Sequence, residues 1–137
     1  MNNQFTQRVS DIITYSKEEA NRLRNSYIGP EHLLLGVIRE GEGKAIEILL
    51  NLNINLQDIK YKLENILKRD SETDAIYDAN INFNESASKV LKLCILEAKL
   101  LKNSLADSEH ILLAIMRVKD NSAFRLLESS DVTYDKI

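Results

Sequence analysis

The sequence predicts an all-α fold made of two related halves, and three observations lead to this prediction. Only one proline and four glycines occur among 137 residues, so long helices have few interruptions. Apolar residues recur at spacings of three and four, which is the helical period. Residues 83–137 repeat residues 5–59 without a gap, at an offset of 78 positions. We therefore expect one compact domain, residues 1–137, with two pseudo-twofold-related four-helix repeats.

The internal repeat predicts the boundaries of the two halves. Identical residues occupy 15 of the 55 aligned positions, and most other apolar positions keep their character. The first repeat covers about residues 5–68 and the second about 83–137, joined by an acidic linker at 69–82. We expect the last helix of the second repeat to be truncated, because the sequence ends where that helix begins. A match of this length predicts one shared fold for both halves.

Four helices are expected in the first repeat, over about residues 7–24, 30–40, 45–52 and 56–67. Thr6 and Asn55 stand where N-caps are favoured, because their side chains can accept a bond from a free backbone N–H group. Pro30 suits the first position of a helix, where its missing N–H has no intrahelical partner. The second helix is apolar nearly all round, which predicts that it is central. Leu34 and its counterpart Leu112 are therefore expected to be deeply buried.

Composition argues against several classes of partner. The net charge of −3 offers no general attraction to nucleic acid or to an anionic membrane. No apolar stretch approaches the roughly 20 residues that span a bilayer, and the polar start has no signal-peptide pattern. Cys94 is the only cysteine, which excludes an internal disulfide and fits a reducing compartment. We expect no nucleic-acid partner, no membrane partner and a cytoplasmic location.

No pattern in the sequence indicates a catalytic residue, a metal site or a cofactor. Gly41-Glu42-Gly43-Lys44 lacks the earlier glycine and the following Ser or Thr of a phosphate-binding loop, so we interpret it as a turn between helices. Cys94 aligns with Ser16 on the inward face of a helix, which indicates a small buried side chain. The chain is therefore expected not to be an enzyme. A small helical enzyme that uses the Glu-His pairs described next is the alternative from another class.

Two Glu-His pairs stand at matching places in the repeats, Glu31-His32 and Glu109-His110. A glutamate in the first turn complements the helix dipole, and the histidine can bridge to a neighbouring helix. Adjacent residues point to different sides of a helix, so these pairs are poorly spaced for joint metal binding. The pairs therefore have either a structural role at the helix start or a role in binding a ligand.

The block from Asn25 to Gly43, NSYIGPEHLLLGVIREGEG, resembles the hallmark of the Clp N-terminal repeat. Glu18-Glu19-Ala20 in the preceding helix matches the same family pattern. The intact Arg-Glu-Gly-Glu-Gly ending, Arg39 to Gly43, is similar to ClpC-type AAA+ unfoldases more than to their ClpA or ClpB relatives. This resemblance covers nearly the whole chain.

The resemblance implies a docking domain for adaptor proteins and protein substrates. ATP is then used by the parent protein, which acts as an AAA+ ring and feeds a Clp peptidase, and this domain itself carries no cofactor. The alternative is a stand-alone accessory protein of the same fold that regulates a Clp complex without its own ATPase.

The resemblance also implies a receptor for phosphoarginine-marked proteins, in which each glutamate faces the guanidinium and the helix start receives the phosphoryl group. A carboxylate pairs well with a guanidinium, and free N–H groups at a helix start suit an anion. This sequence has Pro30 where the family has Thr, and Asp107 where it has Gly. The carboxylate of Asp107 repels a phosphoryl group, so the first site is expected to be stronger. The candidate ligand-binding residues are Gly29, Pro30, Glu31, His32, Ser108, Glu109 and His110.

Overall fold

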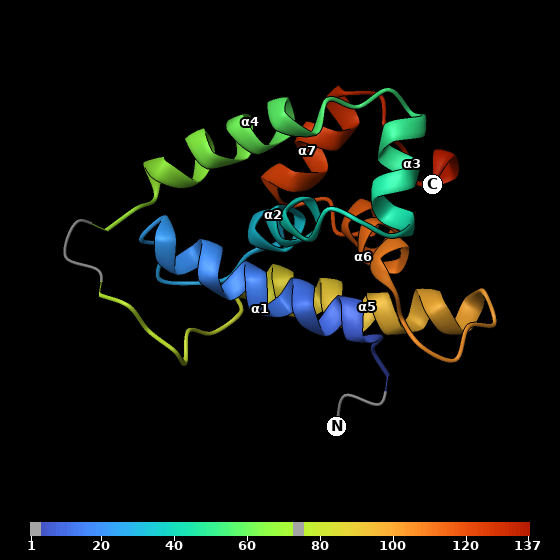
Figure 1. Cartoon of the computed structure of the whole chain (residues 1–137), viewed down its shortest axis with the longest axis horizontal. Helices are drawn as coiled ribbons and strands as arrows, with labels where there is room; N and C mark the ends of the chain where they lie inside the picture. The colour runs from blue at the N-terminus through green and yellow to red at the C-terminus, as the bar shows by residue number, and fades with distance from the viewer. Residues whose placement is uncertain (1–3, 73–75) are drawn as a thin grey trace.

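The computed structural model describes residues 4–72 and 76–137 and confirms the all-α prediction (Figure 1). Within these residues the chain forms seven α-helices, a short 3-10 helix and two isolated β-bridges, with no strand. The helices are α1 Gln7–Arg22, α2 Pro30–Glu40, α3 Lys44–Asn51, α4 Leu56–Arg69, α5 Glu85–Leu100, α6 Ser108–Arg117, α7 Ser122–Ser129 and the 3-10 helix η1 Tyr134–Lys136. We call residues 5–59 and 83–137 the first and second unit.

The first helices of the two units begin and end at equivalent positions, as the 78-residue offset predicts. Thr6 caps α1 by accepting a hydrogen bond from the backbone of Val9, and Asn84 caps α5 in the same way. Each helix is followed by one residue in the left-handed region, Arg24 with φ 60° and Lys102 with φ 62°. Equal starts, lengths and exits confirm that the two segments share one local structure.

The two units are interlocked rather than joined end to end. The backbone N–H of Thr6 donates to Ala106 O at 3.0 Å, so the lead into α1 pairs with the loop before α6. The reciprocal bond runs from Asn84 N to Ile28 O at 2.9 Å, so the lead into α5 pairs with the loop before α2. Such an exchange of equivalent contacts is what a pseudo-twofold arrangement requires. Each unit therefore completes the other, and the chain forms one domain.

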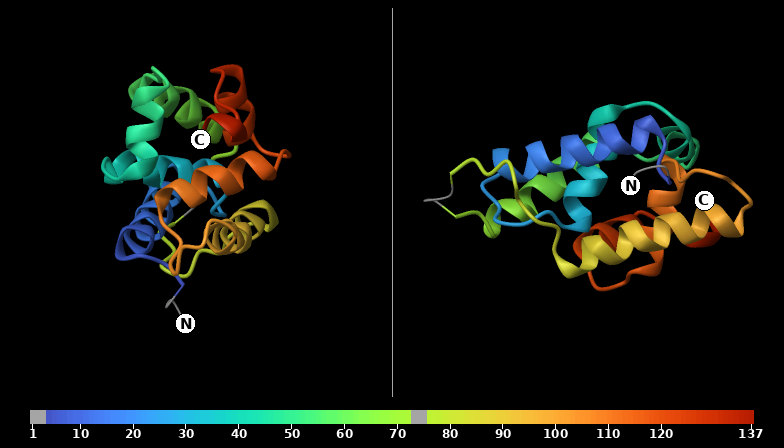
Figure 2. Two further views of the ribbon diagram at one scale, coloured as in Figure 1. Left: turned by 90° about the vertical axis from the view of Figure 1, so that its right-hand side faces the viewer. Right: turned by 90° about the horizontal axis from the view of Figure 1, so that it is seen from below.

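Helices α2 and α6 form the middle layer of the molecule (Figure 2). Helices α1 and α5 lie on one side of them, and α3, α4 and α7 lie on the other. Leu34 and Leu112, on α2 and α6, are completely buried, as predicted. A helix covered on both sides needs an apolar surface nearly all round, which is the pattern that both middle helices carry.

Glycine at position 36 is required by a close approach between α1 and α2. A Cβ atom at Gly36 would lie 2.6 Å from the backbone oxygen of Ile12, which is shorter than any acceptable contact. The counterpart in α6 is Ala114, so the second pair of helices accommodates a methyl group at the matching place. The pseudo-symmetry is thus approximate at the level of helix packing.

The loop between α2 and α3 is a turn, as its sequence predicts, and the side chain of Arg8 packs against it. Gly41 and Gly43 adopt positive φ values of 77° and 91°, which glycine tolerates best. Arg8 Nε donates to Glu40 Oε2 at 3.1 Å, and a Cβ at Gly43 would lie 2.7 Å from Arg8 Cδ. The second unit has Ser86 in place of Arg8 and has no glycine in this turn, so it has neither feature.

The two units differ in their fourth helix, which is an α-helix in the first unit and a short 3-10 helix in the second. Asn55 caps α4 through the backbone of Asp58, as predicted, and α4 continues through Arg69, so the linker begins one residue later than expected. The corresponding part of the second unit is the 3-10 helix η1. Described linker residues are mostly exposed, and Asn21 holds the backbone of Asp78 through two hydrogen bonds of 2.9 and 3.1 Å. Asp74, part of the predicted acidic linker, lies outside the described residues.

Candidate functional site

Both histidines of the Glu-His pairs are buried and organise the start of a middle helix. His32 Nδ1 accepts a hydrogen bond from Gly29 N at 2.8 Å, so the proton lies on Nε2, which donates to Asn25 Oδ1 at 2.8 Å. His110 repeats the arrangement with Asp107 N at 2.8 Å and Asn103 Oδ1 at 3.3 Å. The histidines therefore bridge the helix start to the preceding loop, rather than to a neighbouring helix.

Burial lowers the pKa of His32 from 6.5 to about 4, with a smaller opposing effect from Glu19. Protonation would also remove the acceptor of the Gly29 N–H group. Between pH 6.5 and 4 the unfolded chain binds a proton that the folded chain does not bind. The stability that neutral His32 contributes is therefore complete above about pH 6.5 and is lost as the pH falls through 4.

We predict that acidification from pH 7 to 4 removes on the order of 3 kcal/mol of unfolding free energy through His32 alone. Urea unfolding of the wild type and of His32→Gln across this range measures the effect, because carboxylates common to both proteins cancel in the difference. The variant should show a shallower pH dependence. Parallel pH curves for the two proteins would contradict the prediction.

Glu31 connects the first unit to the second. Its carboxylate is nearly buried, and Oε2 accepts a hydrogen bond from Ser122 N at 2.9 Å, at the first residue of α7. A Cβ atom at Gly29 would lie 2.6 Å from Oε1 of the same carboxylate, so glycine leaves the space that Glu31 occupies. A carboxylate at the start of α7 also complements the dipole of that helix. Glu31 thus has a structural partner within the chain.

The corresponding place in the second unit has different contacts. Ser108, the counterpart of Pro30, uses its hydroxyl to accept a hydrogen bond from Ala45 N at 3.2 Å, near the start of α3. Glu109, the counterpart of Glu31, keeps one buried carboxylate oxygen, Oε1, that has no hydrogen-bond partner within the described residues. Such an atom is costly to bury, so a ligand that donates to it is stabilised.

A cavity of about 340 Å³ lies beside this carboxylate. It is lined by Lys44, Ile48, Leu101, Asn103, Glu109, His110, Leu113 and Ile137. The Asp107 carboxylate lies at the start of α6, where its Oδ1 accepts a hydrogen bond from Ser108 N at 2.7 Å and from the Thr6 hydroxyl at 3.2 Å. The start of α6 is therefore occupied by a carboxylate of the chain itself, as the sequence predicts for Asp107.

The predicted residues form two separate sites, one in each unit. Gly29, Pro30, Glu31 and His32 surround the start of α2, and Ser108, Glu109 and His110 surround the start of α6. The start of α2 faces the start of α7, and the start of α6 faces the start of α3. The sequence alone did not identify the residues that these facing helix starts contribute, which are Lys44, Ala45 and Ser122. The internal repeat is the only feature of the sequence that could have indicated these residues, because Lys44 and Ser122 are equivalent positions of the two units.

The described residues outside the two Glu-His sites were considered as a nucleophile, a metal site or a membrane-spanning helix. Cys94 is completely buried, like its counterpart Ser16, and burial raises the pKa of its thiol to about 12. A protonated, inaccessible thiol is a poor nucleophile. No three His, Cys, Asp or Glu residues among those described are placed to hold a metal ion. In the same part of the chain, no helix has the length and apolar character needed to cross a bilayer.

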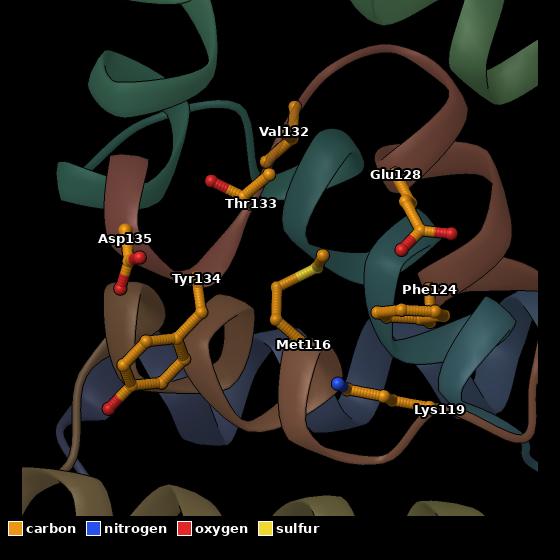
Figure 3. A pocket seen from close by; sticks show the side chains of 8 residues that line it. All are labelled: Met116, Lys119, Phe124, Glu128, Val132, Thr133, Tyr134 and Asp135. Atoms are coloured by element: carbon orange, nitrogen blue, oxygen red, sulfur yellow. The ribbon is translucent and has the colours of Figure 1, made fainter.

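A second cavity, of about 220 Å³, lies under the C-terminal segment (Figure 3). Its lining residues are Met116, Lys119, Phe124, Glu128, Val132, Thr133, Tyr134 and Asp135. The Lys119 ammonium lies 6.0 Å from the centre of the Phe124 ring. None of the candidate residues from the sequence contributes to this cavity, so it is separate from both sites.

Comparisons with known proteins identify the family. The model of the Clp repeat (R) N-terminal domain matches residues 4–130. The chloroplastic chaperone protein ClpC1 of Oryza sativa subsp. japonica is 38% identical over 125 residues, which are 91% of this chain and 13% of that protein. A ClpA homolog of Porphyra purpurea, described as an ATP-dependent Clp protease ATP-binding subunit, is 35% identical over 133 residues, 97% of this chain and 16% of its own. The chain thus spans less than a fifth of the length of these relatives.

Solved structures show the same fold. The Hsp104 N-terminal domain from Candida albicans superposes with a TM-score of 0.78 at 22% identity, covering 97% of this chain and 85% of that one. The N-terminal domain of ClpD from Arabidopsis thaliana gives a TM-score of 0.74 at 21% identity, with coverage of 98% and 90%. The family match extends over nearly the whole chain, including both interlocked units. The chain therefore belongs to the Clp repeat N-terminal domain family.

Proposed function

We propose that this chain is the adaptor- and substrate-docking domain of an ATP-dependent Clp unfoldase. The observation that carries the proposal is the family match over residues 4–130, because relatives that contain this domain are named as Clp chaperones and ATP-binding subunits of Clp protease. The interlocked units provide a rigid platform for protein binding. ATP hydrolysis, the AAA+ ring and the Clp peptidase belong to the parent protein in this proposal.

Competition tests the docking role. Excess purified chain, added to a reconstituted ClpC-type ATPase and peptidase, should slow adaptor-dependent degradation several-fold, because it occupies the adaptor without delivering the substrate to a ring. Degradation of an adaptor-independent unfolded substrate serves as the control for effects on the ring. Unchanged adaptor-dependent rates at a tenfold excess, about the level needed for competition, would count against docking.

Phosphoarginine is the ligand we propose for the Glu-His sites. A guanidinium can donate to the unpartnered Oε1 of Glu109, and the ammonium of Lys44 in the adjoining cavity can attract the phosphoryl group. At the first site, Oε2 of Glu31 already accepts from Ser122 N. These contacts favour stronger phosphoarginine binding at the second site. From the sequence alone we expected the first site to be stronger, because of the charge of Asp107. Asp107 still opposes the phosphoryl group at the second site through like charge.

Calorimetry with free phosphoarginine compares the two sites. Glu109→Gln should remove most of the binding heat if the second site dominates, and Asp107→Gly should strengthen binding. Glu31→Gln provides the matched variant of the first site, and unmodified arginine is the ligand control. A wild-type chain that gives no heat at millimolar ligand would exclude phosphoarginine as its signal. Full binding by Glu109→Gln would move the ligand away from the second site.

A further inference from the structure

The outer face of α5 is apolar where the equivalent face of α1 is polar. Leu96 and Leu100 are 51% and 69% exposed. Leu93 is partly buried against the core and borders the same face, because residues three and seven apart are neighbours along a helix. Helix α5 lies along the outer edge of the molecule (Figure 2). The counterparts in α1 are Tyr15, Glu18 and Arg22.

On α1 these positions are occupied by an ionic cluster. Arg39 Nη2 lies 2.7 Å from Glu18 Oε1, and its guanidinium carbon lies 4.5 Å from the centre of the Tyr15 ring. Arg22 pairs with Glu19 and with Glu64 of α4. The first unit therefore satisfies this face with its own charges. The equivalent arginine of the second unit, Arg117, pairs with Glu97 as Arg39 pairs with Glu19, but its other partner is Tyr134. Leu96 and Leu100 therefore stay exposed.

The surface around Leu96 differs from the surface that α4 covers on the first unit. In the first unit Leu23 is 5% exposed, whereas its counterpart Leu101 is 56% exposed. The side chains of Glu18 and Arg22 nevertheless remain 46% and 48% exposed beside α4. A helix placed on the second unit as α4 lies on the first would therefore approach Leu100, as Glu64 approaches Arg22, and would leave Leu96 accessible.

Within residues 86–104, the segment that carries these leucines, every exposed charge is positive. Between residues 86 and 104 the only carboxylate is Glu97, which is buried and paired with Arg117. Lys92 and Lys99 lie four residues before and three residues after Leu96, so all three share one face. Within the described residues, neither lysine forms an ion pair. The chain as a whole has a net charge of −3, so this basic surface is a local feature.

We propose that this leucine-lysine face, made of Leu93, Leu96, Leu100, Lys92 and Lys99, docks an acidic amphipathic helix of a partner protein. A partner helix can place apolar residues at matching three- and four-residue spacings and carboxylates toward the lysines. A second copy of the chain would bring lysines against lysines. An acidic chain is also poorly suited to an anionic membrane. The proposal rests on the docking function above and names the kind of partner that this surface accepts.

The test is a methyl NMR titration of the full chain with a synthetic helical peptide of about 18 residues, roughly five turns. The peptide carries leucines along one face and glutamates beside them. We expect shifts of the leucine methyl groups of the face and a dissociation constant that rises with salt. Leu96→Glu should weaken binding at least tenfold, about 1.4 kcal/mol. Lys92→Glu should also weaken binding, and it leaves the leucines in place.

Matched controls distinguish specific binding at this surface from non-specific binding of the peptide. Tyr61→Glu, at an exposed position of α4, should leave the dissociation constant unchanged. A peptide with lysines in place of the glutamates should not bind. Equal binding of the two peptides, undiminished binding by folded Leu96→Glu, or shifts confined to other helices would overturn the proposal. Dimerisation through this face, or preferential binding to phosphatidylserine vesicles over the acidic peptide, would overturn it in favour of another occupant.

The result is distinguishable from failure of the docking function itself. Leu96→Glu leaves Glu31, Glu109 and the cavity beside Glu109 untouched, so its heat of phosphoarginine binding should equal that of the wild type. Loss of competition by the wild-type chain would reject the docking function. Competition that persists in Leu96→Glu, together with no peptide binding by the wild type, would reject only the leucine-lysine face.

Discussion

Replacement of Leu34 by alanine is expected to lower the free energy of unfolding by about 2–5 kcal/mol. Leu34 is completely buried in α2, which is covered by helices on both sides, so the neighbours cannot collapse fully into the space left by the side chain. Leu112 stands at the equivalent place in α6 and should respond in the same range. Urea unfolding followed by circular dichroism measures both losses.

The matched control for the core is Leu50→Ala on α3, because this leucine is largely exposed. Its replacement removes the same atoms from a surface position and should cost little. A stability of Leu34→Ala equal to that of Leu50→Ala would show that α2 is not in the centre of the core. The prediction therefore tests the layered arrangement as well as one residue.

Replacement of Arg117 by alanine should destabilise the protein clearly more than the loss of a surface ion pair, because it strands a buried carboxylate. The Glu97 side chain is almost completely buried and is bound by Arg117 and by the Tyr134 hydroxyl. Without the arginine, the buried carboxylate keeps only the Tyr134 hydroxyl as a hydrogen-bond partner. Thermal melts at pH 7 should show the loss, and Glu97→Gln in the same background should restore part of it.

Lys62→Ala provides the surface comparison for this ion pair. Lys62 and Asp58 are both half-exposed and lie 3.0 Å apart on α4, so their pairing contributes well under about 1 kcal/mol. Burial of the carboxylate is the difference between the two pairs. Equal losses for Arg117→Ala and Lys62→Ala would mean that Glu97 is solvated in the folded protein.

Local patterns in the sequence determined most of the helical structure. Thr6, Asn55 and Pro30 mark helix starts through the chemistry of their own side chains, and the structure has all three helices beginning at these residues. The apolar pattern of the second helix predicted the burial of Leu34. These predictions depend on neighbours within one or two turns, so they can be made without knowledge of the other unit. The repeat then extended them to the second half.

The contacts that define the candidate sites were decided only by the tertiary structure. Glu31 meets Ser122 across 91 positions of sequence, and Ser108 meets Ala45 across 63. Helical periodicity says which face of a helix is buried but not which helix start it faces. Ser108, at the position equivalent to Pro30, accepts a hydrogen bond from Ala45 N of α3, and Oε1 of Glu109 has no hydrogen-bond partner within the described residues. These contacts between the units, which the sequence does not show, are the reason for our proposal that the second site binds the ligand more strongly.

The sequence by itself thus determined two equivalent halves, their helix starts and their buried leucines, because propensity, capping and periodicity act over short stretches of chain. Only the tertiary structure decided how the halves interlock through Thr6 and Asn84, which carboxylate keeps an open oxygen, and which face of α5 lacks a partner. Those features depend on the positions of groups far apart in sequence. Their geometry follows from the packing of whole helices around α2 and α6.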